Sequence, residues 1–108
     1  MPEIKPLKKL HWTSHSRSKM RYYGLSEARV RRIIHTPQRI EEGVAPETIA
    51  MMQRAGSGKH PYELWVMLEE GKTKRKIISA WRYPGVTKPR SDITRDILKK
   101  VYDESVSE

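Results

Sequence analysis

The residue types best suited to chemistry gather near the amino terminus, in the stretch HWTSHSRSKMRYYGLS at positions 11–26. Histidine is a side chain that can give or take a proton near neutral pH, and the lysine and arginines of this stretch can hold an anion. If residues 13–23 form a helix, spacings of four and three residues place four titratable side chains on one stripe. That stripe consists of His11, His15, Lys19 and Tyr22.

Such a stripe offers the components of metal-free RNA cleavage, which needs a base for the 2′-hydroxyl group, an acid for the leaving oxygen and cations for the developing charge. His15 is the candidate acid or base, and Lys19, one turn further on, is the candidate ligand of the scissile phosphate. Arg82 and Tyr83, at the end of a predicted strand, could add charge or a proton. The alternative for His15 is structural, because it could cap the helix or pack against Trp12.

Positive charge is concentrated in the same part of the chain. The net charge is +9, and residues 8–39 carry nine lysines or arginines against one acid, Glu27. A concentrated basic segment is the electrostatic footprint expected for a polyanion, most often nucleic acid. The residues predicted to contact nucleic acid are Arg17, Arg21, Arg29, Arg32, Arg75 and Trp81. The alternative is a solvated basic surface, and Trp81 is as well suited to a core as to stacking on a base.

Other classes of protein fit the composition poorly. The 108 residues include no cysteine, so the chain has no disulfide framework and no thiolate metal site, which agrees with a cytoplasmic location. No HExxH motif occurs, and AGSGKHP at 55–61 lacks the spacing of a phosphate-binding loop, so we expect no metal and no cofactor. No apolar run is long enough for a signal peptide or a membrane span, and we expect no membrane partner.

The patterns of apolar residues predict two helices, three or four strands and a final helix. Gly24 can end the first helix because it tolerates positive φ, and Pro37 closes the second. The continuous apolar run at 64–68 is typical of a central strand covered on both faces. The predicted elements are an edge strand at 7–12, helices at 13–23 and 27–35, strands at 38–44, 62–69 and 74–83, and a helix at 93–104.

Local patterns also bear on three details of this layout: the secondary structure of one segment, the faces of the last strand and the packing of the first two helices. The segment ETIAMMQR at 47–54 has the propensity of a helix, but an apolar run this short cannot be settled by periodicity. In the last strand, a strict two-residue period groups Ile77 with Ser79 on one face and Ile78 with Ala80 on the other. Only two or three residues separate the two helices, so an antiparallel hairpin is expected.

These elements form a single predicted domain over residues 1–108, with a loose arm at 1–6 and a frayed tail at 105–108. The pattern S-H-x-x-x-[RK]-M-x-x-x-G-[IL]-S, followed by a second helix and a β-meander, resembles the domain-of-unknown-function family 4258. That family is related to BrnT and, more distantly, to RelE/ParE-like toxins. The matching residues, within a resemblance that spans about 11–83, are Ser14, His15, Lys19, Met20, Gly24, Leu25, Ser26, Val30 and Ile34.

The resemblance implies both a fold and an activity. The implied fold is an α+β domain with an N-terminal helical hairpin packed on a curved antiparallel sheet, and segment 47–54 is then a strand. We expect three to four strands in this sheet and a C-terminal helix after it. The implied activity is that of a toxin-type ribonuclease.

Three functions are compatible with these patterns. The first is a small, basic, toxin-like protein directed at RNA, acting as a metal-independent endoribonuclease. The second is a non-catalytic module that binds RNA or DNA through the same surface. The third is a protein-interaction domain whose basic face binds an acidic partner such as an antitoxin. The oligomeric state is left open by the sequence.

Overall fold

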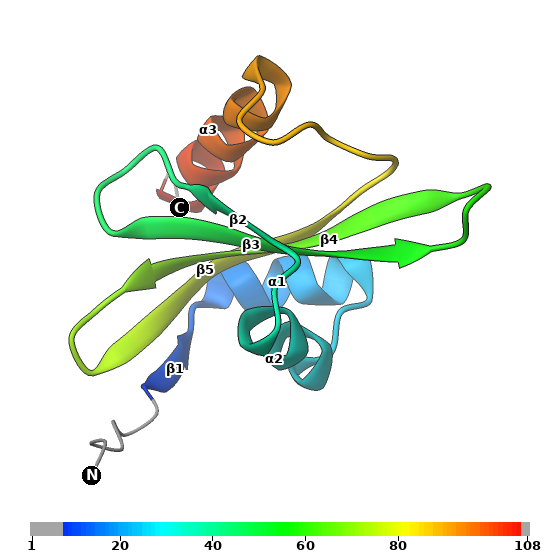
Figure 1. Cartoon of the computed structure of the whole chain (residues 1–108). Helices are drawn as coiled ribbons and strands as arrows, with labels where there is room; N and C mark the ends of the chain where they lie inside the picture. Colours follow the sequence, from blue (N-terminus) through cyan, green and yellow to red (C-terminus); the bar gives the residue numbers. More distant parts are fainter. Residues whose placement is uncertain (1–7, 107–108) are drawn as a thin grey trace, which may run out of the picture.

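The structure is a computed structural model that describes residues 8–106, and it consists of a five-stranded mixed sheet with helices on both sides (Figure 1). The strands are β1 (Lys9–Trp12), β2 (Arg39–Glu42), β3 (Thr48–Gly56), β4 (Pro61–Glu70) and β5 (Lys74–Tyr83), and they lie in the order β1-β5-β4-β3-β2. The helices are α1 (Ser14–Tyr23), α2 (Glu27–His35) and α3 (Asp92–Val106). The predicted arm at 1–6 lies outside the described residues. Of the predicted tail, residues 105 and 106 belong to α3, and the last two residues also lie outside.

Helices α1 and α2 begin and end where their capping residues stand. Thr13 Oγ1 accepts a hydrogen bond from the backbone N–H of Ser16 at 3.1 Å, and Ser26 Oγ accepts one from that of Arg29 at 3.0 Å. Gly24 ends α1 in the left-handed region at φ 69°. The predicted bounds of α2 are confirmed, and α1 begins one residue after its predicted start.

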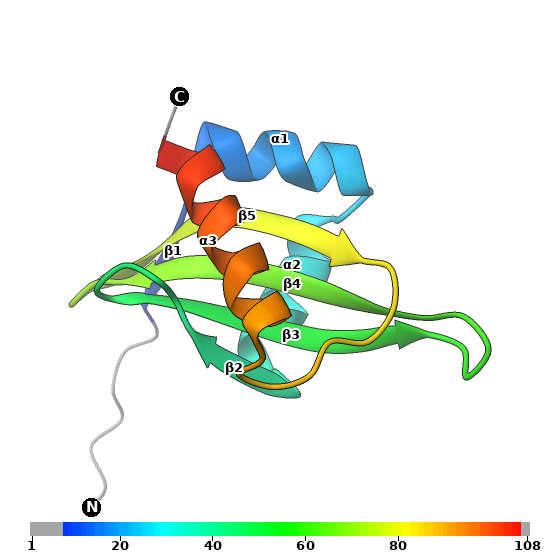
Figure 2. The ribbon, with the colours of Figure 1, turned by 90° about the horizontal axis from the view of Figure 1, so that it is seen from above.

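The two helices do not form the predicted hairpin packed on the sheet. Helix α1 lies along β5, whereas α2 packs across β4 and β3 (Figures 1 and 2). The cause lies at the start of α1, where the hydroxyl and the backbone N–H of Thr13 donate to the carbonyl oxygen of Ile77 at 2.9 and 3.3 Å. Because this cap and β1 attach the helix to β5, α1 packs along that strand.

The sheet also differs from the predicted antiparallel sheet of three to four strands. It has five strands, and β1 pairs with β5 in parallel, with Lys9 opposite Lys74 and Trp12 opposite Ile77. A strand of only four residues carries no sequence signal that identifies so distant a partner. The segment 47–54, which propensity alone predicts as helix, lies largely in strand β3, because its pairing with both β2 and β4 outweighs local preference.

Two hydrophobic clusters lie on opposite faces of the sheet. The cluster on the side of α1 and α2 contains Met20, Leu25, Val30, Ile33, Met51, Leu64, Val66, Leu68, Ile77 and Ala80. The cluster on the side of α3 contains Ala50, Met52, Trp65, Met67, Ile78, Trp81 and Leu98. Strand β4 supplies alternate residues to both clusters, so its continuous apolar run is confirmed as a central strand covered on both faces.

Strand β5 departs from strict alternation. Successive residues of β4 pair with Ser79 and then with Ile77, so Ile78 is an extra residue in a β-bulge. As a result Ile77 and Ala80 belong to one cluster, and Ile78 and Trp81 belong to the other. The predicted grouping of Ile78 with Ala80 is therefore wrong, because one inserted residue reverses the faces of everything that follows it.

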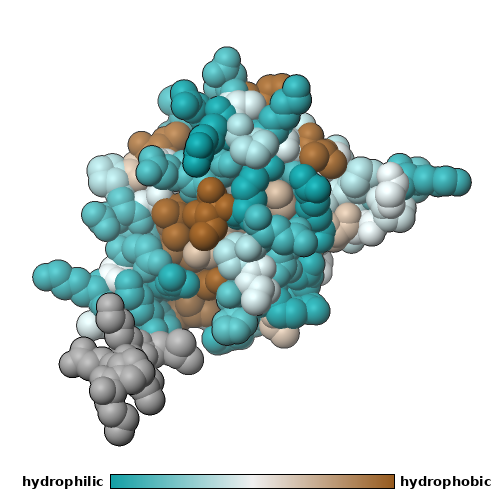
Figure 3. All heavy atoms as spheres, in the orientation of Figure 1, coloured by the Kyte–Doolittle hydropathy of each residue, from teal (hydrophilic) through white to brown (hydrophobic). Residues whose placement is uncertain are grey.

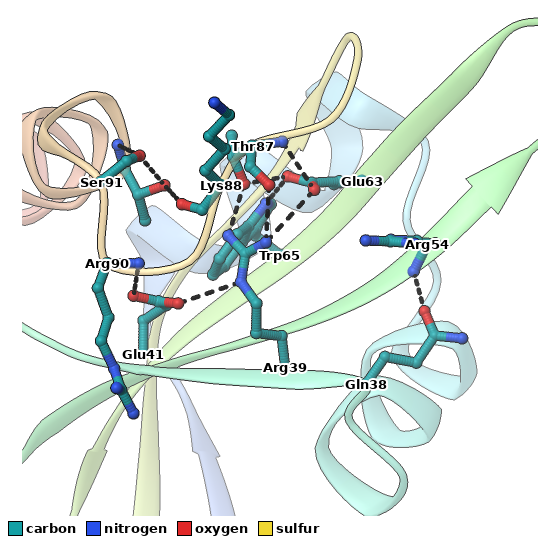
Figure 4. Close-up of polar contacts among 11 residues, drawn as sticks. Gln38, Arg39, Glu41, Arg54, Glu63, Trp65, Thr87, Lys88, Arg90 and Ser91 are labelled. Atoms are coloured by element: carbon teal, nitrogen blue, oxygen red, sulfur yellow. Dashed lines mark hydrogen bonds and ion pairs between the residues drawn. The ribbon is translucent and has the colours of Figure 1, made fainter.

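A buried polar network holds the segment between β5 and α3 against the sheet (Figure 4). The carboxylate of Glu63, which is fully buried, accepts hydrogen bonds from Trp65 Nε1 at 3.0 Å, Thr87 N at 3.0 Å and Thr87 Oγ1 at 2.7 Å. Arg39 donates to the Thr87 carbonyl oxygen at 2.9 Å and lies 3.1 Å from the Glu41 carboxylate. These bonds fix the chain that leads into α3, which covers the face opposite α2.

Candidate nucleic-acid interface

The predicted catalytic residues line two different pockets. Lys19, Arg82 and Tyr83 line a pocket of about 240 Å³ between α1, β5 and α3. His15 is 8% exposed and lines another pocket of about 250 Å³, between the start of α1 and the end of α3. Among the described residues, the two pockets share no lining side chain. The candidate base and the candidate phosphate ligands therefore do not face one common cavity.

The stripe predicted along α1 divides between surface and interior. His11 lies in β1 rather than in the helix and is exposed, and Tyr22 is 79% exposed. His15 is buried together with Ser16 and Met20. His15 thus lies on the buried side of the helix.

Two of the predicted catalytic cations make contacts within the protein. Lys19 Nζ lies 3.4 Å from the carboxylate of Glu104 in α3. The guanidinium carbon of Arg82 lies 4.1 Å from the ring centroid of Tyr62, a stacking distance. Lys19 therefore links α1 to α3, whereas Arg82 reaches the ring of Tyr62, which packs on the cluster beneath α1 and α2.

The tryptophan near the basic surface is Trp12 rather than Trp81. Trp81 is 6% exposed and stacks on Trp65, with ring centroids 5.6 Å apart and planes 4° from parallel. Of the two roles that the sequence left open for Trp81, in the core or stacked on a base, the structure shows the core position. Trp12 is half-buried in β1, and the guanidinium groups of Arg17 and Arg31 each lie 5.6 Å from its ring centroid.

The net charge of the helices distinguishes the two sides of the sheet. Hydropathy does not, because hydrophilic side chains predominate above and below the sheet in Figure 3. Helices α1 and α2 together carry six cations and one acid, whereas α3 carries three cations and four acids. We call the surface formed by these two helices the α1–α2 face, and its cations are Arg17, Lys19, Arg21, Arg29, Arg31 and Arg32. The helices of this face therefore carry a net charge of +5 (six cations, one acid), whereas α3 carries −1 (three cations, four acids).

Most of the cations on the α1–α2 face lack a carboxylate partner. Arg17 Nη1 lies 2.8 Å from Glu27, and Lys19 is paired with Glu104 as described. The cations that form no ion pair with a carboxylate among residues 8–106 are Arg21, Arg29, Arg31 and Arg32. Their charge is not cancelled locally and can meet phosphate oxygens from outside.

Two arginines, Arg82 and Arg29, lie near Tyr62 at one end of this face. Arg82 stacks on its ring, and Arg29 Nη1 donates a hydrogen bond to Gln53 Oε1. Gln53 Nε2 donates in turn to the carbonyl oxygen of Arg32 at 3.0 Å. Burial, together with the nearby charge of Arg32, holds the pKa of Arg29 below its ordinary value. Sequence patterns identified the arginines but missed Tyr62 and Gln53, since no periodic signal marks either residue.

Arg75, the remaining predicted contact, takes part in a structural ion pair. Its Nη2 lies 2.7 Å from the carboxylate of Glu70, and Lys8 Nζ lies 3.1 Å from the same group. Burial raises the pKa of Glu70, but hydrogen bonds from Arg75 and Lys8 outweigh it, so the pKa lies below its ordinary value. Arg75 is therefore engaged at the turn between β4 and β5.

Within residues 8–106, no three histidine, cysteine or acidic side chains are grouped closely enough to hold a metal ion. The same part of the chain has no helix with the length and apolar character needed to cross a membrane. On the α1–α2 face, the structure brings arginines together with aromatic rings.

Comparison with known proteins finds no matching family model, no matching curated protein and no matching solved structure for this chain. The resemblance to family 4258, and the relationship to BrnT and RelE/ParE-like toxins that it implies, therefore stays a prediction.

Proposed function

We propose that this protein binds RNA through the α1–α2 face and does not cleave it. The observation that carries the proposal is the set of four arginines on α1 and α2 that have no carboxylate partner among the described residues. When such cations meet a nucleic-acid backbone, they displace the counterions condensed on it, and this release favours binding. Helix α3, with acids slightly in excess, offers no comparable surface.

Binding without cleavage is favoured over a ribonuclease because the residues needed for cleavage line two different pockets. His15 is buried and lines a pocket that Lys19, Arg82 and Tyr83 do not line. A general base must come within hydrogen-bond reach of the proton it removes, and the phosphate must lie beside it at that moment.

RNA is named rather than DNA because the family that the sequence resembles implies an RNA substrate. The aromatic residue on this surface also fits such a substrate. Trp12 is flanked by Arg17 and Arg31, and unpaired RNA bases stack on aromatic rings and guanidinium planes. A cytoplasmic location is part of the proposal, since a chain without cysteine is compatible with a reducing compartment.

Fluorescence anisotropy with a short labelled RNA, over a range of salt concentrations, tests the proposal. The variant Arg31→Gln/Arg32→Gln removes two unpaired cations from the α1–α2 face. If both contact phosphates, it should bind more weakly and lower the slope of log K against log salt by about 1.4, at about 0.7 per contact on a single strand. The matched control is Arg95→Gln/Lys99→Gln, which removes two exposed cations from α3. It should bind almost as the unchanged protein does.

Three results would contradict the proposal. Equal losses in the two double variants would mean that binding does not use the α1–α2 face. RNA cut by the protein in the presence of EDTA would show that binding is accompanied by cleavage, and His15→Ala would then test the base. Failure to bind RNA or DNA at low salt would exclude nucleic acid and leave an acidic protein partner as the remaining function.

A further inference from the structure

The stack of Arg82 on Tyr62 carries a more specific inference, which rests on the proposed function. Arg82 is exposed at the end of β5, whereas Tyr62 is half-buried against the cluster beneath α1 and α2. The guanidinium carbon lies 4.1 Å from the ring centroid, so the ring supports the guanidinium group from the protein side. The exposure of Arg82 leaves the side of this group away from the ring facing solvent.

The ring of Tyr62 is itself held in place. It lies against Gly56 at the end of β3, where an added Cβ atom would come within 2.9 Å of Tyr62 Cδ1. Gly56 has φ 80°, a conformation that glycine adopts readily, so the turn brings the backbone close to the ring. A support fixed in this way reduces the entropy that a ligand must lose on binding.

Arg29 places a further positive charge near Tyr62, and the charge of Arg32 lies close to that of Arg29. Arg29 is held by a neutral hydrogen-bond partner, Gln53, which also bonds to the backbone of α2. Neither arginine forms an ion pair with a carboxylate among residues 8–106. Like charges held together without a counter-charge repel each other, and the lowered pKa of Arg29 reflects both its burial and this repulsion. An anion bound between them would relieve that cost.

We infer that an unpaired base stacks on the outer face of the Arg82 guanidinium group while its phosphate is bound by Arg29 and Arg32. The ligand class is single-stranded nucleic acid. In a duplex the faces of each base are covered by its neighbours, so a duplex could use the arginines only through its phosphates. Tyr62 acts as a positioning residue, because it holds Arg82 flat rather than contacting the base.

The inference is tested with Arg82→Lys, measured against one RNA sequence as a single strand and as a duplex. Lysine keeps the charge but lacks the planar group that stacks. We expect about a fivefold loss of affinity for the single strand, the size of a cation–π contact of ordinary strength, with an unchanged salt slope. Affinity for the duplex should stay the same. A second variant, Tyr62→Leu, removes the support for the guanidinium group and should give a similar loss for the single strand alone.

The matched control is Arg54→Lys. Arg54 is an exposed arginine near the same end of the sheet, but it follows Gln53 and so points to the opposite face. This control should leave both affinities unchanged, and circular dichroism should show that all three variants are folded.

Two outcomes would overturn the inference. Arg82→Lys could bind the single strand as tightly as the unchanged protein, or it could lose affinity equally for single strand and duplex. In either case RNA binding that depends on Arg31 and Arg32 would still stand, so the two failures can be told apart. If the unchanged protein binds no nucleic acid at all, both proposals are wrong.

Discussion

Replacement of Arg39 by Met tests the buried network that joins β2 and β4 to the segment before α3. The guanidinium group of Arg39 lies 3.1 Å from Glu41 and 3.8 Å from Glu63, whose side chains are 6% and 0% exposed. It also lies 5.0 Å from the ring centroid of Trp65. Methionine can keep much of the apolar contact with this ring, but it leaves two carboxylates buried without their cation.

The expected cost follows from that burial. Removing one partner of a buried ion pair destabilises a protein by about 3–5 kcal/mol, because the other charge stays buried and uncompensated. Glu63 keeps its hydrogen bonds from Trp65 and Thr87, so we expect the lower end, about 3 kcal/mol. A domain of this size has a total stability of about 5–15 kcal/mol, and the midpoint of thermal unfolding should fall by about 10–20 °C.

Urea unfolding followed by circular dichroism measures this loss. The control is Arg21→Met, an exposed arginine of α1 on the other side of the sheet from the network, and it should change stability by less than about 0.5 kcal/mol. The double variant Arg39→Met/Glu63→Gln should lose less than the sum of the two single variants, because the residues share one network. A loss below about 1 kcal/mol for Arg39→Met, with an unchanged urea slope, would refute this reasoning.

Three further predictions concern caps, turns and pH. Thr13→Val removes both the N-cap of α1 and the donor to Ile77, so urea unfolding should show a loss of about 1–2 kcal/mol, which Thr13→Ser should largely restore. Gly56→Ala would place a Cβ atom 2.2 Å from the His60 carbonyl oxygen at φ 80°, and thermal unfolding should reveal a loss of at least about 1–3 kcal/mol. The pKa of Glu70 is lower in the folded than in the unfolded chain, so its charge stabilises the fold above the ordinary value of 4.5, and this contribution disappears as the pH falls through the folded pKa. Glu70→Gln should therefore be less stable than the unchanged protein at neutral pH but not in acid, and a difference independent of pH would count against the ion pair.

Local signals in the sequence were sufficient to predict the helices and the central strand. The hydroxyls of Thr13 and Ser26 and the glycine at position 24 mark the ends of α1 and α2 through contacts within a few residues. The apolar run in β4 marks a strand buried on both faces. In each case the cause of the structure lies inside the segment that shows the pattern.

The arrangement of these elements depends on contacts between residues far apart in the sequence, and local patterns were insufficient to predict it. The partner of β1 is β5, and this pairing places α1 along the strand instead of in a hairpin with α2. The bulge at Ile78 reverses the faces of the last strand, which places Trp81 in the core beneath α3. Neither the pairing nor the bulge alters the local pattern of apolar residues enough to be predicted.

The candidate site was predictable in its charges but not in its aromatic partners. Counting cations located the basic helices, because charge density is a property of composition. Tyr62 joins the arginines only through the fold, since it stands in β4 while Arg82 stands in β5 and Arg29 in α2. The buried carboxylate of Glu63 was missed for a related reason, because its partners come from β2 and from the segment before α3.

NMR chemical-shift mapping tests the proposed face most directly. A short single-stranded RNA would be titrated into the isotope-labelled protein at low salt, and the backbone amide signals followed along the chain. We predict the largest shifts in α1, α2 and the last residues of β5, with α3 nearly unchanged. Shifts confined to α3, or no shifts at saturating RNA, would contradict binding through the α1–α2 face.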